Sequence, residues 1–158
     1  MSDILDDDAL RPVDPRYRNV LRVRMAVLGA MIVAAGIFGE FMVDGWHGAF
    51  VGPALVIAAT ILWLLPKRRY RRISYALGRD CLRVRQGWLR RTDTVVPLGR
   101  VQHIDVHQPM IDRAFGLAIL ILHTAGSHNA SVGLPGLSHE DAVAMREEIA
   151  ARIRRELA

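Results

Sequence analysis

The sequence contains a single cysteine, Cys81, and it lacks the short motifs that mark many enzymes. One cysteine excludes a disulfide within the chain and a metal site built from several thiolates. There is no Walker loop, no dinucleotide-binding glycine pattern after a strand and no zincin motif. Ser131 and Ser138 lack the Gly-x-Ser-x-Gly context of a hydrolase nucleophile, and Cys81 follows Asp80 in a setting that does not activate a thiol. We therefore expect no enzymatic activity and no cofactor.

Histidines and carboxylates are present, but their spacing does not predict a metal or catalytic site. His103 and His107 share one face of an expected strand, where four residues span about 13 Å, too far for both to bind one ion. His123 and His128 can meet across a hairpin, although no carboxylate or cysteine completes a site there. We interpret the two carboxylates around the irregular Pro109 segment as a solvated pair; they are Asp105 and Asp112.

Charge is nearly absent between residues 25 and 65. Met25–Val43 is interrupted only by Glu40, and Ala49–Leu65 contains no charged residue. As helices these runs span about 28 and 26 Å, close to the hydrocarbon thickness of a bilayer. A signal peptide is disfavoured because a second apolar segment follows at once, and buried helices of a soluble protein would need more covering chain than remains. The sequence predicts a transmembrane hairpin.

Positive charge flanks the two apolar segments, whereas the short loop between them contains no Lys or Arg. Since cytoplasmic flanks are rich in these residues, we predict that both termini are cytoplasmic and that the chain lies in the inner cell membrane. The net charge of +5 does not indicate nucleic acid, because the basic residues gather beside the apolar segments. Candidate contacts to anionic lipid headgroups follow the second segment: Lys67, Arg68, Arg69, Arg71 and Arg72.

Glu40 is the one ionisable residue inside the first segment. It lies four residues before Asp44, so its carboxylate can snorkel to the membrane surface; a pore-facing position is the alternative. Small residues in the same segment permit close approach of a neighbouring helix: Gly29, Gly36 and Gly39.

The residues after the second segment predict an antiparallel β-domain, because short apolar or β-branched runs alternate with Gly and Pro. Alternation in Leu82–Arg85 places its leucine and valine in a core and its arginines in water. Leu117–Leu122 is apolar on both faces, so it lies in the middle of the domain or under a membrane or partner. We expect Phe115 and Leu120 in the core. The predicted strands are 73–77, 81–86, 92–96, 101–107, 117–124 and 130–134.

A C-terminal helix is predicted after a strand that Pro135 and Gly136 end. Ser138 suits the N-cap and Asp141 the third helical position. Apolar residues then recur every three or four positions, as in a helix that closes one end of a curved sheet. They are Ala142, Met145, Ile149, Ile153 and Leu157.

Five stretches together resemble the bacterial pleckstrin-homology-like domain of YdbS-like membrane proteins: 73–77, 87–91, 96–102, 112–118 and 134–137. The resemblance covers about residues 70–155, and the two preceding helices match the usual arrangement of that family. It implies a barrel or curved sheet capped by a C-terminal helix and anchored in a membrane. It implies no particular ligand, because fold and site are separable. Pairing of two such domains, as in double-copy members, would require oligomerisation or another protein here.

The sequence thus predicts a cytoplasmic segment at 1–24, a hairpin at 25–65 and a pleckstrin-homology-like domain at 70–158. We expect a non-enzymatic scaffold or adaptor that contacts membrane lipids and assembles with itself or another membrane protein, not with nucleic acid. An oligomeric transporter or channel component is the alternative, and an enzyme acting on lipids would lack an identifiable catalytic centre. The candidate association surface is Leu117, Ile119, Leu120, Ile121 and Leu122.

Overall fold

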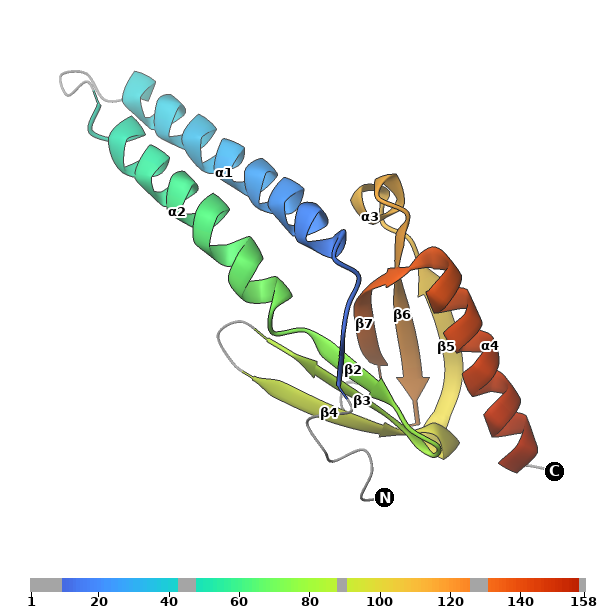
Figure 1. Ribbon diagram of the computed structural model, residues 1–158. Coiled ribbons are helices and arrows are strands. Elements are labelled where there is room, and N and C mark those ends of the chain that lie inside the picture. The colour runs from blue at the N-terminus through green and yellow to red at the C-terminus, as the bar shows by residue number, and fades with distance from the viewer. Residues whose placement is uncertain (1–9, 43–47, 88–90, 126–130, 157–158) are drawn as a thin grey trace. The chain divides into compact units, whose positions relative to one another are not determined.

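The computed structural model describes residues 10–42, 48–87, 91–125 and 131–156 (Figure 1). The predicted loop at 44–48 is thus mostly outside the described residues, as are His128 and Leu157. The chain divides into two compact units. A helical unit comprises residues 18–70, and a β-unit combines the chain up to Tyr17 with residues 71 onward.

The helical unit is an antiparallel hairpin of α1 (Tyr17–Met42) and α2 (Val51–Tyr70). Both helices are long and apolar enough to cross a membrane, with mean hydropathies of 1.9 and 1.4 over their most apolar windows. Each is longer than its predicted apolar run, because it continues into the basic flank. Arg and Lys are good helix formers, and their long side chains reach water from a helix end.

Small residues set the spacing of the hairpin. A Cβ on Gly36 would lie 2.9 Å from Cβ of Ala54, and one on Gly29 would lie 3.4 Å from Cβ of Ala58. A Cβ on Gly39 would lie 3.6 Å from the ring of Phe50. These contacts confirm that the glycines permit close helix approach.

The β-unit contains two antiparallel sheets. The first has the order β1-β2-β3-β4, and the second has the order β5-β6-β7. The six predicted strands are all present, together with the short strand β1, which the sequence did not predict. The strands are β1 (Arg11–Pro12), β2 (Ser74–Leu77), β3 (Cys81–Gln86), β4 (Thr92–Pro97), β5 (Val101–His107), β6 (Leu117–Thr124) and β7 (Ser131–Ser138).

Strand β6 lies in the middle of the second sheet, as its apolar sequence indicates. Leu117, Leu120 and Leu122 are fully buried, and so are Leu82 of β3 and Ile149 of α4 (His139–Glu156). Helix α4 runs alongside the second sheet and contacts all three of its strands (Figure 1). The core of the β-unit therefore combines the inner sides of both sheets with the apolar stripe of α4.

Three local expectations differ from the structure. Arg83 is buried rather than solvated, because its guanidinium pairs with the Asp93 carboxylate at 2.8 Å and 2.5 Å. Phe115 is half-buried, since it follows the short helix α3 (Met110–Ala114) at the surface, whereas Leu120 is in the core as expected. Asp112 is fully buried in α3, so it is not half of a solvated pair.

Strand β7 passes through Pro135 and Gly136 instead of ending before them. It is an edge strand, where a missing proline N–H is tolerated. The register shifts between Ala118 and Ile119, so that Gly136 is the extra residue of a bulge, with a φ of 78°. A Cβ there would lie 2.8 Å from Cγ of Tyr17, so only glycine fits both the backbone angle and the contact.

Candidate binding groove

A hollow of the β-unit lies between strand β5 and helix α4. It is an open groove of about 640 Å³. Its walls combine residues from the start of β5 with residues from the second half of α4. Apolar side chains from both elements line it, namely Val101, Ile104, Ala150, Ala151 and Ile153, together with Gln102, Arg146, Glu147 and Arg154.

Strand β5 gives this groove its chemical character. Within the described residues, β5 pairs with β6 on one side and with no strand on the other. The register shifts between Val101 and His103, so Gln102 is an extra residue that interrupts the regular ladder. An edge strand presents backbone N–H and C=O groups that an added strand can pair with. An extended peptide in the groove would thus lie beside unpaired backbone groups of β5.

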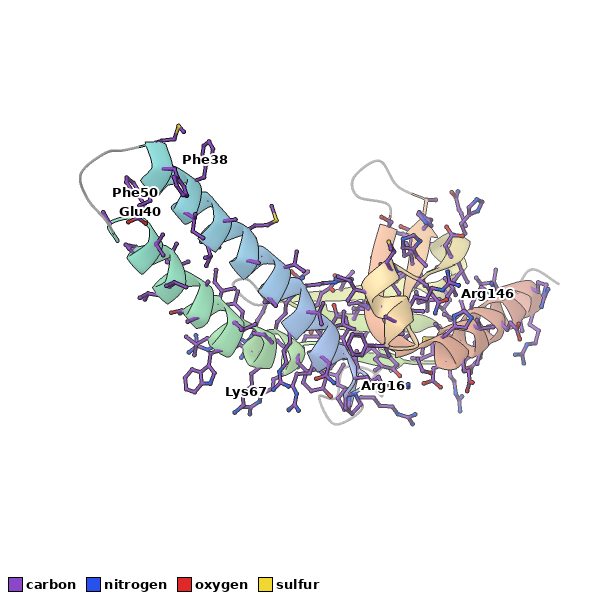
Figure 2. The ribbon with its side chains drawn as sticks, turned by 90° about the horizontal axis from the view of Figure 1, so that it is seen from above. Arg16, Phe38, Glu40, Phe50, Lys67 and Arg146 are labelled. Atoms are coloured by element: carbon purple, nitrogen blue, oxygen red, sulfur yellow. The ribbon has the colours of Figure 1, made fainter. Side chains whose placement is uncertain are left out.

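The rim of the groove is mainly basic. Arg146 reaches Glu147 at 3.7 Å, and the side chains of this pair are 42% and 71% exposed. Such exposed pairs contribute about 0–1 kcal/mol, so Arg146 can exchange its partner at little cost. Figure 2 labels Arg146 on α4. Arg154, which lines the same groove, is exposed at the same rim. Two arginines against one glutamate favour a ligand that carries carboxylates.

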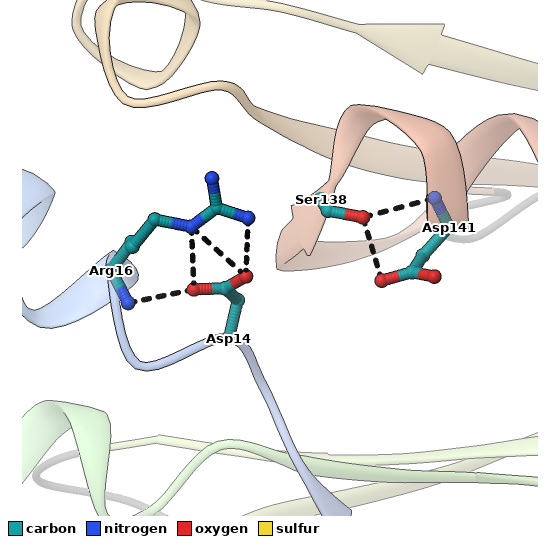
Figure 3. Close-up of polar contacts among 4 residues, drawn as sticks. All are labelled: Asp14, Arg16, Ser138 and Asp141. Carbon is teal, nitrogen blue, oxygen red and sulfur yellow. Dashed lines mark hydrogen bonds and ion pairs between the residues drawn. The ribbon is translucent and has the colours of Figure 1, made fainter.

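Ser138 fixes the start of α4 as predicted. Its Oγ accepts a hydrogen bond from the Asp141 backbone N–H at 3.0 Å and donates one to the Asp141 carboxylate at 2.6 Å (Figure 3). This cap satisfies a backbone donor in the first turn of α4.

The segment before α1 belongs to the β-unit. The backbone N–H of Asp14 donates to the Gly136 carbonyl at 2.8 Å, and Tyr17 is buried against Gly136. The Arg16 guanidinium pairs with the Asp14 carboxylate at 2.8 Å (Figure 3). These hydrogen bonds lower the pKa of the Asp14 carboxyl and raise that of Arg16. Residues 11–17 of the predicted cytoplasmic N-terminal segment at 1–24 therefore belong to the β-unit, and its later residues form the start of α1.

A family model for the bacterial PH domain matches residues 23–153. The chain belongs to the bacterial PH domain family. It is 24% identical over 143 residues to the UPF0699 transmembrane protein YdbS of Bacillus subtilis (strain 168), which covers 87% of this chain and 88% of that relative. No solved structure matches the chain. Together with the two apolar helices, this confirms a membrane protein with a bacterial PH domain, as the sequence resemblance predicted.

The candidate association surface on this bacterial PH domain is smaller than its sequence suggests. Leu117, Leu120 and Leu122 point into the core and cannot contact a partner while the domain is folded. Ile119 and Ile121 remain half-buried on the opposite face of β6. Their neighbours on β5 are His107 and Asp105, so the face is not uniformly apolar.

Histidines gather on that same face of the bacterial PH domain. The ring centroids of His103 and His123 are 6.3 Å apart, and Nε2 of His123 lies 3.2 Å from the Asp105 carboxylate. No group of three His, Cys, Asp or Glu residues that could hold a metal ion occurs among the described residues.

The five candidate headgroup contacts are exposed, with Lys67, Arg68 and Arg69 in the last turn of α2 and Arg71 and Arg72 just after it. The hairpin register, in which residue 29 faces 58 and residue 36 faces 54, brings the arginines of α1 to the same end of the helical unit. They are Arg18, Arg22 and Arg24. The hairpin therefore gathers both basic flanks at one end of the helical unit.

Glu40 lies at the other end of the hairpin. Its carboxylate accepts a hydrogen bond from the backbone N–H of Gly48, just before α2 begins. Figure 2 shows Glu40 beside Phe50, close to the loop. A carboxylate near a helix N-terminus satisfies a free N–H and is favoured by the helix dipole. This contact gives Glu40 a structural role within one chain.

Proposed function

We propose that this protein is a non-enzymatic, membrane-anchored adaptor, whose bacterial PH domain holds an extended, acidic segment of a partner polypeptide. The observation that most supports this proposal is the groove between the unpaired edge of β5 and helix α4. Addition of a strand to such an edge provides affinity through main-chain hydrogen bonds, and a neighbouring groove selects side chains.

The chemistry of the groove supports a peptide better than a small polar substrate. Its apolar floor combines Val101, Ile104 and Ile153, and its small residues Ala150 and Ala151 leave space for incoming side chains. Arg146 and Arg154 at the rim complement carboxylates on the partner. We assign the partner to the membrane environment, as another membrane protein or a second copy of this chain.

The proposal includes the location of the domain. With the basic flanks at one end of the hairpin, the positive-inside rule favours cytoplasmic termini, a cytoplasmic PH domain and an inner-membrane location. The groove would then meet cytoplasmic segments of membrane proteins. The five basic residues from Lys67 to Arg72 would contact anionic lipid headgroups.

A photo-crosslinking amino acid at Gln102 tests the proposal in living cells. Gln102 is exposed and lines the groove, whereas Asp105 is exposed on the opposite face of the same strand. We expect a discrete crosslinked product from position 102 and none from position 105. Mass spectrometry of the product distinguishes another protein from a second copy. Crosslinking from position 105 alone would contradict the groove and favour the face that carries Ile119 and Ile121.

A paired substitution on α4 completes the test. Ala150 lines the groove, and Ala144 is exposed elsewhere on the same helix. Ala150→Phe should fill the groove and abolish the crosslink from position 102, whereas Ala144→Phe should preserve it. Equal crosslinking in both variants would show that the groove is not the binding site.

A further inference from the structure

Met110 is an apolar side chain that the β-unit leaves in solvent. It is 89% exposed, more than Trp63 at 82% or Phe41 at 79% in the spanning helices. It begins α3, the short helix between β5 and β6. Isolated apolar residues are common on protein surfaces, so the exposure of Met110 gains meaning only from the residues and backbone around it.

The backbone around Met110 is firmly held. Gln108 donates a side-chain hydrogen bond to the Leu117 carbonyl at 3.1 Å, and the backbone N–H of Arg113 bonds the Pro109 carbonyl at 2.8 Å. Asp112 is fully buried at the centre of the same turn. The side chain of Met110 therefore projects from a rigid tip, and ordering it in a contact would cost little backbone entropy.

This tip lies at the end of the β-unit where the chain continues into the membrane helices. A Cβ on Gly116, two residues after α3, would lie 3.5 Å from Nη1 of Arg16, and Tyr17 is the first residue of α1. The backbone N–H of His139 bonds the Gly116 carbonyl at 3.0 Å, which places the start of α4 there too. Ser74, soon after α2, pairs with Pro12 on the same segment.

We propose that the α3 tip inserts Met110 into the lipid surface as a second attachment of the domain, beyond its adaptor function. Arg113 is exposed beside Met110, and the side chain of Arg16 is 54% exposed. An apolar side chain next to cations is the pattern that binds the interface of an anionic bilayer, with the apolar group below the headgroups.

The attachment would also orient the groove. Strand β5 runs from Val101, in the groove, to His107, three residues before α3. Its length of about 20 Å separates the lipid contact from the groove. A domain fixed by α3 would thus present the groove away from the lipid.

Site-directed spin labelling of the full-length protein tests this contact. The single cysteine allows a Cys81→Ser background in which Met110→Cys carries the nitroxide. Trp63→Cys on α2 is the membrane control, and Val95→Cys, at a 46% exposed position of β4, is the aqueous control. Each protein is reconstituted as one copy per nanodisc of phosphatidylcholine and phosphatidylglycerol, and the label's accessibility to oxygen and to a water-soluble nickel reagent is measured.

We expect the label at position 110 to prefer oxygen, as the label at position 63 does, and the label at position 95 to prefer the nickel reagent. Equal nickel accessibility at positions 110 and 95 would overturn the proposal. An oxygen preference that occurs only in vesicles with many copies would also overturn it, since Met110 would then be covered by a second protein. Because Met110 is exposed, its replacement leaves the fold intact, which an unchanged unfolding transition checks.

Discussion

The helical unit and the β-unit of this chain are built by opposite packing rules. In the hairpin, glycines and alanines form the contact between helices, and large residues such as Phe38, Phe41 and Trp63 point outward (Figure 2 labels Phe38). In the β-unit, leucines and isoleucines form the centre. Lipid offers no hydrophobic gain for bringing helices together, so close backbone approach stabilises the hairpin, whereas water drives large side chains into the β-unit.

The two units should differ most in the stability that each loses when one of its leucines is replaced by alanine. Leu120→Ala removes a fully buried side chain of β6 and should lower the free energy of unfolding of the β-unit by about 2–5 kcal/mol. Leu55→Ala, at a 52% exposed position of α2, should change stability little, because lipid surrounds the side chain. Denaturant unfolding in detergent measures both. Equal losses would mean that Leu55 packs against another protein segment.

The packing of the hairpin is tested by adding one methyl group. Gly36→Ala places a Cβ 2.9 Å from Ala54, which should push the helices apart and cost about 1–3 kcal/mol. Gly52→Ala is the matched control, because a Cβ there meets nothing within 4 Å. It should be neutral or stabilise α2, since alanine is the better helix former. Thermal unfolding in detergent gives the order of stability, and a stable Gly36→Ala protein would contradict the close contact.

The ion pair between buried Arg83 and Asp93 should make a smaller contribution to the stability of the β-unit, and this contribution depends on pH. Hydrogen bonds from Arg83 hold the pKa of the Asp93 carboxyl below its usual value. The folded state therefore favours the ionised form, so stabilisation is present above the usual carboxyl pKa of about 4 and is lost as pH falls through the lower folded-state value. Asp93→Asn should cost about 1 kcal/mol at neutral pH, because solvent screens the partly exposed carboxylate.

Unfolding curves from neutral pH to below the usual carboxyl range check this effect. The difference in free energy of unfolding between the parental protein and Asp93→Asn should disappear as the solution becomes acidic. A constant difference across this range would show that the pair does not respond to protonation of Asp93.

The smallest change is expected at the loop end of the hairpin. Glu40→Gln keeps an oxygen that can accept the Gly48 N–H, so stability should change by less than about 1 kcal/mol. Glu40→Leu removes the acceptor and should destabilise the hairpin more. Reconstituted vesicles should show no ion or proton flux with either the parental protein or Glu40→Gln. Flux that disappears with Glu40→Gln would favour the transporter alternative over the adaptor.

The strands of the β-unit could be predicted because their patterns are local. Apolar residues alternate in β3, and Gly or Pro separates the runs. Both ends of five predicted strands therefore lie within one residue of the observed ends. Strand β1 has two residues and no periodicity. It pairs with β2, in which Ser74 and Tyr75 are its partners and are far from β1 in the sequence. The burial of Arg83 likewise depends on Asp93 from the neighbouring strand.

The groove could not be predicted for a similar reason. Ile153 belongs to the apolar stripe that predicts an amphipathic helix, Ala150 lies beside that stripe, and Ile104 belongs to an ordinary strand. Only the packing of α4 against the sheet leaves space between them. The bulge at Gln102 has no sequence signature, because a single extra residue is visible only when the partner strand is known.

The mass of the complex extracted from native membranes tests the adaptor function most directly. Parental protein and Ala144→Phe should both be recovered at a mass above that of one 17.6 kDa chain, with the same partner or partner copy bound. Ala150→Phe should be recovered as the single chain, because its ring fills the groove between β5 and α4. A parental protein recovered as the single chain, or an Ala150→Phe complex of unchanged mass, would contradict the account.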